Sequence, residues 1–153
     1  PVALLPASVF AAGSLISFTT GTSWGTMGIL MPLALPIILN LSDGLDPETS
    51  QMLVSSTVAA VFSGAVFGDH CSPFSDTTIV SAIACDLNPW EHVRTQLPYA
   101  LITAATALVF GFIPLGAGIP LWICLPAGII FLLLLPTIHH KMSSRSAKIT
   151  HSV

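Results

Sequence analysis

Charged residues are scarce in this sequence, and their scarcity excludes an ordinary soluble domain. Asp, Glu, Lys and Arg make up 7% of the 153 residues, whereas soluble domains carry about a quarter. Hydrophobic residues account for 53%, and the mean hydropathy is +0.86. These values indicate an integral membrane protein.

Two further features are absent. The three cysteines, Cys71, Cys85 and Cys124, form no CxxC pattern, so we expect no disulfide framework. The sequence also lacks an initiator Met and a basic leader, because it opens in apolar residues from Pro1 onward. We therefore interpret it as the C-terminal piece of a longer protein, whose missing N-terminal half would contribute to function.

The few charges lie in short islands between long uncharged stretches. No Asp, Glu, Lys or Arg occurs in 1–42, 49–68, 77–85 or 95–138. A helix needs about 20 apolar residues to cross a bilayer, so we predict two ordinary transmembrane helices within 97–138. A turn rich in proline and glycine at 114–120 would separate them, and residues 139–153 would form a tail.

The first 96 residues follow a different pattern. The segment "TTGTSWGT" (19–26), with two glycines and five hydroxyl side chains, interrupts the uncharged stretch 1–39. Gly68 and Pro73 break the stretch 51–86. A straight helix of either length would reach about 55 Å, far more than the hydrocarbon core. We predict a re-entrant hairpin at 1–39 with its tip at 19–26, and an unwound transmembrane helix over 51–86.

The two breaks also predict where the interior of the protein lies. Irregular backbone is tolerated at membrane depth only where protein or a watery cavity satisfies its N–H and C=O groups. Transporters with discontinuous helices bind ions and substrates at such breaks. The predicted fold class is all-α integral membrane, with residues 1–96 as a transport half-repeat that forms the second half of an inverted-repeat ion-transporter fold.

The distribution of Lys and Arg predicts the orientation of the helices. Lys141, Arg145 and Lys148 place the tail in the cytoplasm of a multi-pass cell-membrane protein. Counting back from the tail, the turn at 114–120 lies outside, a loop around Arg94 lies inside, and the acidic loop between the hairpin and the broken helix lies outside.

Asp69 and Asp76 are the only charged residues inside an apolar region. They lie seven residues apart in "GDHCSPFSDTT" (68–78), so even an intact helix would place them on one face. An ionisable residue at this depth is costly and is by default a functional-site hypothesis. Asp76 or Ser75 is also placed to cap a second half-helix that begins near them.

The neighbouring polar residues each allow two interpretations. His70 is suited either to carry protons near neutral pH or to donate a hydrogen bond to a carbonyl freed by the break. Ser72 is either a ligand or a small residue that permits close helix packing. The hydroxyls of Ser75, Thr77 and Thr78, like those of the hairpin tip, either serve as oxygen ligands for a cation or bond back to their own backbone.

No basic residue lies in either apolar stretch to neutralise Asp69 and Asp76. Unpaired buried carboxylates must take up protons or bind a cation. Competition of Na⁺ and protons for one set of oxygens is the minimal chemistry of cation/proton exchange, so we expect a transporter without a cofactor rather than an enzyme. Two other classes stay open: an intramembrane hydrolase that uses Cys71 or Ser72 with His70 and an aspartate, and a transporter of divalent metals.

Three strings, "GDHCSPFSDTT" (68–78), "HVRTQLPYAL" (92–101) and "GTSWGT" (21–26), resemble the C-terminal portion of the NhaC-type sodium/proton antiporter family. The resemblance covers about residues 13–101. It implies exchange of cytoplasmic Na⁺ for external H⁺ by a protein related to transporters with two inverted repeats. Some relatives couple Na⁺ or H⁺ to organic acids, so an organic-acid exchanger is the alternative.

The resemblance also groups the site residues. The polar signature for ion and proton binding comprises Asp69, Asp76, His70, Ser72, Ser75, Thr77 and Thr78, with the two aspartates as Na⁺ ligands. The partner motif at the hairpin tip comprises Thr20, Gly21, Thr22, Ser23, Gly25 and Thr26. The expected partners are Na⁺, H⁺, the lipid bilayer and the missing N-terminal half of the same protein. A homodimer is left open, and no nucleic acid is expected.

Overall fold

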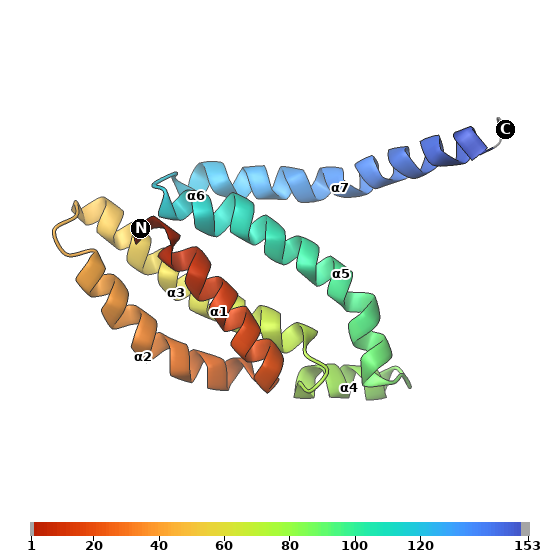
Figure 1. The fold of residues 1–153 in the computed structure, drawn as a ribbon, viewed down its shortest axis with the longest axis horizontal. Coiled ribbons are helices and arrows are strands. Elements are labelled where there is room, and N and C mark those ends of the chain that lie inside the picture. The colour runs from red at the N-terminus through yellow and green to blue at the C-terminus, as the bar shows by residue number, and fades with distance from the viewer. Residues whose placement is uncertain (1, 151–153) are drawn as a thin grey trace.

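The computed structural model describes the backbone of residues 2–150 and the side chains of residues 2–135. Within this part, all of the regular secondary structure is helical (Figure 1). The helices are η1 (Val2–Leu4), α1 (Leu5–Thr20), α2 (Ser23–Leu41), α3 (Pro47–Cys71), α4 (Asp76–Ala84), α5 (Pro89–Ala107), the π-helical segment η2 (Leu108–Phe112), α6 (Ile113–Gly116) and α7 (Leu121–Thr150).

The lengths and hydropathy of these helices agree with the membrane protein that the composition predicts. Among the residues that the structure describes, four segments are long and apolar enough to cross a bilayer: Val2–Thr20, Ser23–Leu41, Pro47–Cys71 and Pro89–Gly116. The predicted all-α class is confirmed, and the four apolar helices indicate a multi-pass membrane protein. The re-entrant position of the hairpin and the inverted repeat stay predictions.

Helices α1 and α2 form a hairpin with a very short connection (Figure 1). Gly21 ends α1 in the left-handed conformation, with a φ of 68°, and its N–H donates to the Ser17 carbonyl. Thr22 then caps α2, because its side-chain oxygen accepts a hydrogen bond from the Gly25 N–H at 3.3 Å. Only Gly21 and Thr22 therefore separate the two helices. The connection is shorter than the tip predicted at 19–26.

Helix α1 packs along α3 more extensively than any other pair of helices in the described part of the chain. Gly64 and Gly68 make this possible, since a Cβ at either position would overlap the backbone of α1. The buried Ser17 hydroxyl also donates to the Ala65 carbonyl across the interface. Small residues that let helix backbones approach closely are typical of membrane interfaces. This contact fixes the C-terminal half of α3, where Asp69 lies.

Helices α3 and α4, on either side of the second break, each begin with a capping side chain. Asp46 caps the start of α3, and its hydrogen bond from the Thr49 N–H lowers the pKa of the Asp46 carboxyl. After the break, Ser75 accepts from the Thr77 N–H and caps α4. Ser75 is therefore the cap and Asp76 the first residue of α4, which turns away from the direction of α3 (Figure 1).

Helix α5 begins earlier than the charge pattern predicts. Asn88 caps α5 and Pro89 occupies its first turn, so Arg94 lies within the helix rather than in a loop. Helix α5 continues through η2 and α6 to Gly116, and α7 follows after a turn. The backbone of α7 is helical to Thr150. The basic side chains on which the predicted cytoplasmic tail depends lie outside the described residues.

Candidate functional site

The hairpin tip and the break after α3 lie against each other. A Cβ added to Gly21 would stand 2.9 Å from the backbone carbonyl of Phe74, so the two irregular segments are in direct backbone contact. A cavity of about 380 Å³ opens beside this contact. Its lining residues are Gly21, Thr22, Ser23, Trp24, Asp69, Phe74, Asp76 and Thr77.

Asp69 is the buried acid of this cavity, with only 8% of its surface exposed. Its Oδ2 accepts a hydrogen bond from the Ser23 hydroxyl at 3.2 Å. Its Oδ1 is buried and has no hydrogen-bond partner among the residues that the structure describes. A buried carboxylate oxygen without a donor is strongly destabilised unless a proton or a cation reaches it.

Asp76 and Thr77 face the same cavity from the start of α4. Asp76 is exposed, and its Oδ1 accepts from the Thr77 N–H at 2.8 Å. The Thr77 hydroxyl lies 2.5 Å from the hydroxyl of Ser75. The cavity therefore carries two carboxylates and several neutral oxygens, and neither Lys nor Arg is among its lining residues.

Four helix ends meet around the cavity. Helices α1 and α3 end there, and α2 and α4 begin there. Helix C-termini carry partial negative charge and N-termini partial positive charge. The cavity therefore offers partial negative charge to a cation at the two helix C-termini. The two helix N-termini offer partial positive charge to an anion.

The remaining predicted residues of the two breaks do not line the cavity. Ser72, Ser75 and Thr78 are buried, and Ser72 accepts from the Phe74 N–H at 3.2 Å. In the hairpin, Thr20 and Thr26 bond back to carbonyls of their own helices, as hydroxyls in membrane helices often do. Gly25 lies beside the side chain of Thr22. These residues shape the two breaks.

His70 faces a different space from Asp69. It is exposed and lines a groove of about 600 Å³ between α3 and α5, with Gln96 and Tyr99 on the opposite wall. Successive helical residues point about 100° apart, so neighbours in sequence need not share a site. Cys71 is buried, and no group of three or more His, Cys, Asp or Glu suited to a metal ion occurs in the described part of the chain.

Trp24 and Phe74 line the cavity and Gln96 lines the groove, although none of the three is among the predicted site residues. Trp24 and Phe74 are largely exposed, and nothing in their own residue types marks them as site residues. The side-chain oxygen of Gln96 is buried without a partner among the described residues. The sequence signal that could have identified Gln96 is its position as a polar residue in the apolar stretch after Arg94.

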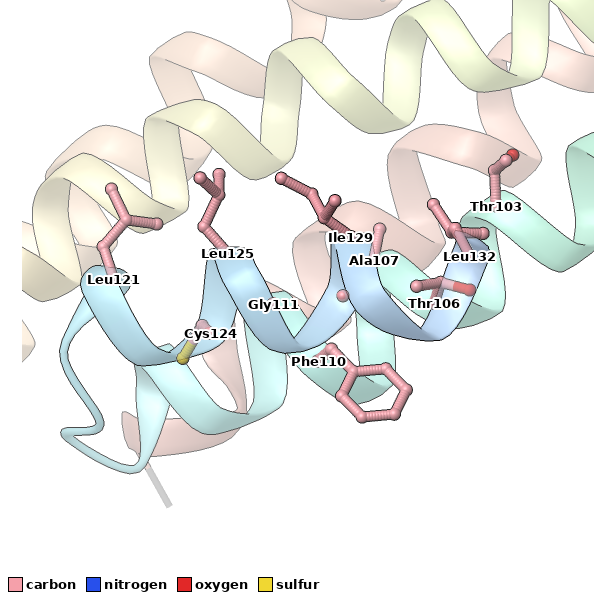
Figure 2. Close-up of a pocket in the computed structure, with 11 residues that line it drawn as sticks. Thr103, Thr106, Ala107, Phe110, Gly111, Leu121, Cys124, Leu125, Ile129 and Leu132 are labelled. Atoms are coloured by element: carbon pink, nitrogen blue, oxygen red, sulfur yellow. The ribbon is translucent and has the colours of Figure 1, made fainter. Parts of the chain in front are cut away.

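A further cavity, of about 240 Å³, lies between α7 and the α5–η2 helix (Figure 2). Leu121, Leu125 and Ile129 point to one side of α7, whereas Phe110 lies on the other side. Its lining contains no acid and no base. This cavity belongs to the apolar packing of the C-terminal helices.

A buried acid where the ends of apolar helices meet is compatible with the ion sites of transporters that have discontinuous helices. The model of the Na⁺/H⁺ antiporter family matches residues 1–116. The chain belongs to this family, which confirms the resemblance in its signature strings and extends it to both sides. The family is one of transporters.

Known relatives support the assignment and differ in their names. An uncharacterised protein of Haemophilus influenzae is 47% identical over 116 residues, which cover 76% of this chain and 21% of the relative. A malate-2H⁺/Na⁺-lactate antiporter of Bacillus subtilis is 35% identical over 112 residues, 71% of this chain and 22% of the relative. An uncharacterised Na⁺/H⁺ antiporter of Haemophilus influenzae is 32% identical over 102 residues, 64% and 20% respectively.

The chain spans about a fifth of the length of these curated relatives. No solved structure matches it significantly.

Proposed function

We propose that this chain forms part of an Na⁺/H⁺ antiporter in which Na⁺ and protons compete for Asp69 and Asp76. Asp69 is the principal ligand, and Asp76 and the Thr77 hydroxyl complete the cation site from the start of α4. Ser23 holds Asp69 in place from the hairpin tip. Na⁺ binds the ionised carboxylates, and protonation expels it.

The observation that carries this proposal is the state of Asp69. The carboxylate is buried, one of its oxygens has no donor among the described residues, and no basic residue lines its cavity. Hard cations prefer oxygen ligands, and the cavity offers carboxylate and hydroxyl oxygens. A proton or an alkali cation removes the same electrostatic cost, which is why the two can replace each other.

The membrane arrangement is part of the proposal. The α1–α2 hairpin enters the membrane as a re-entrant element, α3 and α4 form one broken crossing, and the tail after residue 138 lies in the cytoplasm of a cell-membrane protein. An N-terminal repeat of inverted topology completes the site in the full-length protein. The length of the curated relatives supports this, because the matched residues cover only about a fifth of each relative.

The test is collapse of a pH gradient by added Na⁺ or Li⁺ in vesicles that contain the full-length protein. We expect exchange to weaken at low pH, where protons occupy the carboxylates, and we expect Asp69→Asn and Asp76→Asn each to abolish it. Asp43→Asn, in the exposed loop between α2 and α3, is the matched control. Full exchange by the Asp69→Asn, Asp76→Asn double variant would rule the proposal out.

A second candidate is an organic-acid exchanger coupled to Na⁺ or H⁺. Two observations favour it: the cavity of about 380 Å³ falls in the range of small-molecule sites, and two helix N-termini open into it. The two aspartates disfavour an anion unless Na⁺ neutralises them. Uptake of ²²Na⁺ compared with labelled malate or lactate separates the candidates, since only the exchanger couples Na⁺ movement to the labelled acid.

An intramembrane hydrolase receives no support from the geometry. His70 opens into the α3–α5 groove, whereas Asp69 lines the cavity at the breaks. The groups of a catalytic triad must lie within hydrogen-bond reach of one another. Retained antiport in a Cys71→Ala, Ser72→Ala variant would separate transport from any nucleophile at these positions.

A further inference from the structure

Ser75 is fully buried and makes two hydrogen bonds to Thr77, a residue that lines the cavity at the two breaks. Its hydroxyl oxygen accepts from the Thr77 N–H at 3.2 Å, which is the capping bond of α4. The same oxygen lies 2.5 Å from the Thr77 hydroxyl, within hydrogen-bond distance. Ser75 itself does not line the cavity. It therefore contacts both the backbone and the side chain of a lining residue without facing the cavity.

The hydroxyl of Thr77 differs from other hydroxyls of these helices in its partner. Thr26 and Ser81 each donate to the carbonyl four residues earlier, as hydroxyls in membrane helices often do. Thr77 is the second residue of α4, so the carbonyl four residues before it belongs to Pro73 in the break. Among the described residues, the Thr77 hydroxyl bonds to Ser75 and to no carbonyl. This hydroxyl is therefore not engaged by its own helix.

The bond to Ser75 leaves the Thr77 oxygen able to bind a cation. A hydroxyl has one proton and two lone pairs. The bond between Ser75 and Thr77 uses one of these three on the Thr77 oxygen, whichever of the two oxygens donates, so at least one lone pair stays available. Hard cations take neutral oxygens together with carboxylates as ligands. Thr77 lines the same cavity as Asp69 and Asp76, so its oxygen is available beside theirs.

The position of the Thr77 oxygen depends on the rotamer of the side chain. A threonine in a helix divides between two χ1 rotamers, because its Cβ carries a hydroxyl and a methyl of similar size. A change of rotamer moves the methyl group toward the place of the hydroxyl. The Ser75 oxygen is held in place by its burial and by the Thr77 N–H, so its bond to the hydroxyl favours one of the rotamers.

We propose that Ser75 is a positioning residue for cation binding, which holds the Thr77 hydroxyl in the rotamer whose oxygen coordinates the ion. Ser75 does not contact the cation itself. This role is separate from the capping of α4, because capping involves only the Thr77 N–H. The inference rests on the proposed function, in which the Thr77 hydroxyl completes the cation site.

The test is a double-mutant cycle on the purified full-length protein, with equilibrium binding of ²²Na⁺ as the readout. Ser75→Ala is compared in the wild-type background and in Thr77→Val, because valine keeps the backbone N–H and loses only the hydroxyl. We expect Ser75→Ala to lower the Na⁺ affinity by about tenfold more in the wild-type background, since the two residues act as a pair there. An equal loss in both backgrounds would overturn the proposal, because loss of the cap would then explain it.

A second variant separates positioning from capping and also covers a destabilised Ser75→Ala. Glycine at an N-cap costs only a few tenths of a kcal/mol relative to serine, but it has no hydroxyl. We expect Ser75→Gly to weaken Na⁺ binding about tenfold while its thermal midpoint in detergent stays close to that of the wild type. Wild-type Na⁺ affinity in Ser75→Gly would overturn the positioning role.

The matched control is Ser81→Ala, which removes a back-bonded hydroxyl from the same helix and should leave the Na⁺ affinity unchanged. A tenfold loss in Ser81→Ala would overturn the specific role of Ser75, because any hydroxyl of α4 would then have the same effect. Na⁺ binding retained by Asp69→Asn would instead contradict the proposed function. The two failures are therefore distinguishable.

Discussion

The Ser23 hydroxyl donates a hydrogen bond to Asp69 Oδ2 at 3.2 Å, across 46 residues of sequence. This bond joins the first residue of α2 to the last turn of α3, so it connects the hairpin tip to the broken helix. It leaves Asp69 with one satisfied oxygen and one oxygen without a donor. The proposed cation site depends on the hydrogen bond between Ser23 and Asp69.

Ser23→Ala removes the donor and should weaken Na⁺ binding about tenfold, because a hydrogen bond to a charged group contributes roughly 1.5–3 kcal/mol. The measurement is the Na⁺ dependence of exchange in vesicles containing the full-length protein. Thr19→Ala is the control, since this exposed hydroxyl bonds back to carbonyls of its own helix. An unchanged Na⁺ affinity in Ser23→Ala would show that the hydrogen bond between Ser23 and Asp69 does not contribute to Na⁺ binding.

Gly21→Ala should disrupt the contact between the tip and the break. The residue has a φ of 68°, and an added Cβ would stand 2.9 Å from the carbonyl of Phe74. The left-handed conformation costs an L-residue about 1–2 kcal/mol before any clash. We expect lost exchange and a lower midpoint of thermal unfolding in detergent.

Gly28→Ala is the matched control for Gly21, because nothing lies within 4 Å of a Cβ at position 28. Alanine also has the higher helix propensity, by up to about 1 kcal/mol. Gly28→Ala should keep exchange and thermal stability. If both variants behaved alike, the contact between Gly21 and Phe74 would not be needed.

Gly64→Ala tests the packing that positions α3. A Cβ at Gly64 would overlap the Phe10 carbonyl of α1, and overpacking of this kind costs about 1–3 kcal/mol. The thermal midpoint in detergent should fall, and exchange should fall with it. Gly111→Ala, where a Cβ meets nothing within 4 Å, should leave the midpoint unchanged. Equal midpoints in both variants would contradict close packing of α1 on α3.

Ser75→Ala removes the cap of α4 and should loosen the helix start that presents Asp76. Loss of an N-cap costs about 0.5–2 kcal/mol. We expect weaker Na⁺ binding, with rescue by Ser75→Thr, which restores the side-chain oxygen. Ser81→Ala, which removes a back-bonded exposed hydroxyl from the same helix, is the control. Failure of Ser75→Thr to restore affinity would argue against a capping role.

The sequence predicted that both breaks exist, but Gly68, expected to break the second stretch, lies within α3, and the break begins at Ser72. Glycines and hydroxyls at 19–26, and Pro73 in the second stretch, disfavour a continuous helix. The structure places helix ends inside both segments. Local residue types were enough here, because helix termination is decided mostly by neighbours in the sequence.

Side-chain partners were beyond the sequence. That Ser23 rather than Thr20 or Thr26 reaches Asp69 depends on how the hairpin docks on α3, and that docking depends on Gly64 and Gly68. The same packing turns His70 toward α5. Arg94 was expected in a loop because it is charged, yet the Asn88 cap and Pro89 start the helix before it.

Equilibrium binding of ²²Na⁺ to the purified full-length protein tests the central claim most directly. At about pH 8 the wild-type protein should bind Na⁺ and the Asp69→Asn variant should not. Lowering the pH should displace the ion from the wild-type protein, because protons take the same carboxylates. Na⁺ binding that survives in Asp69→Asn, or that is independent of pH in the wild-type protein, would contradict competition at this residue.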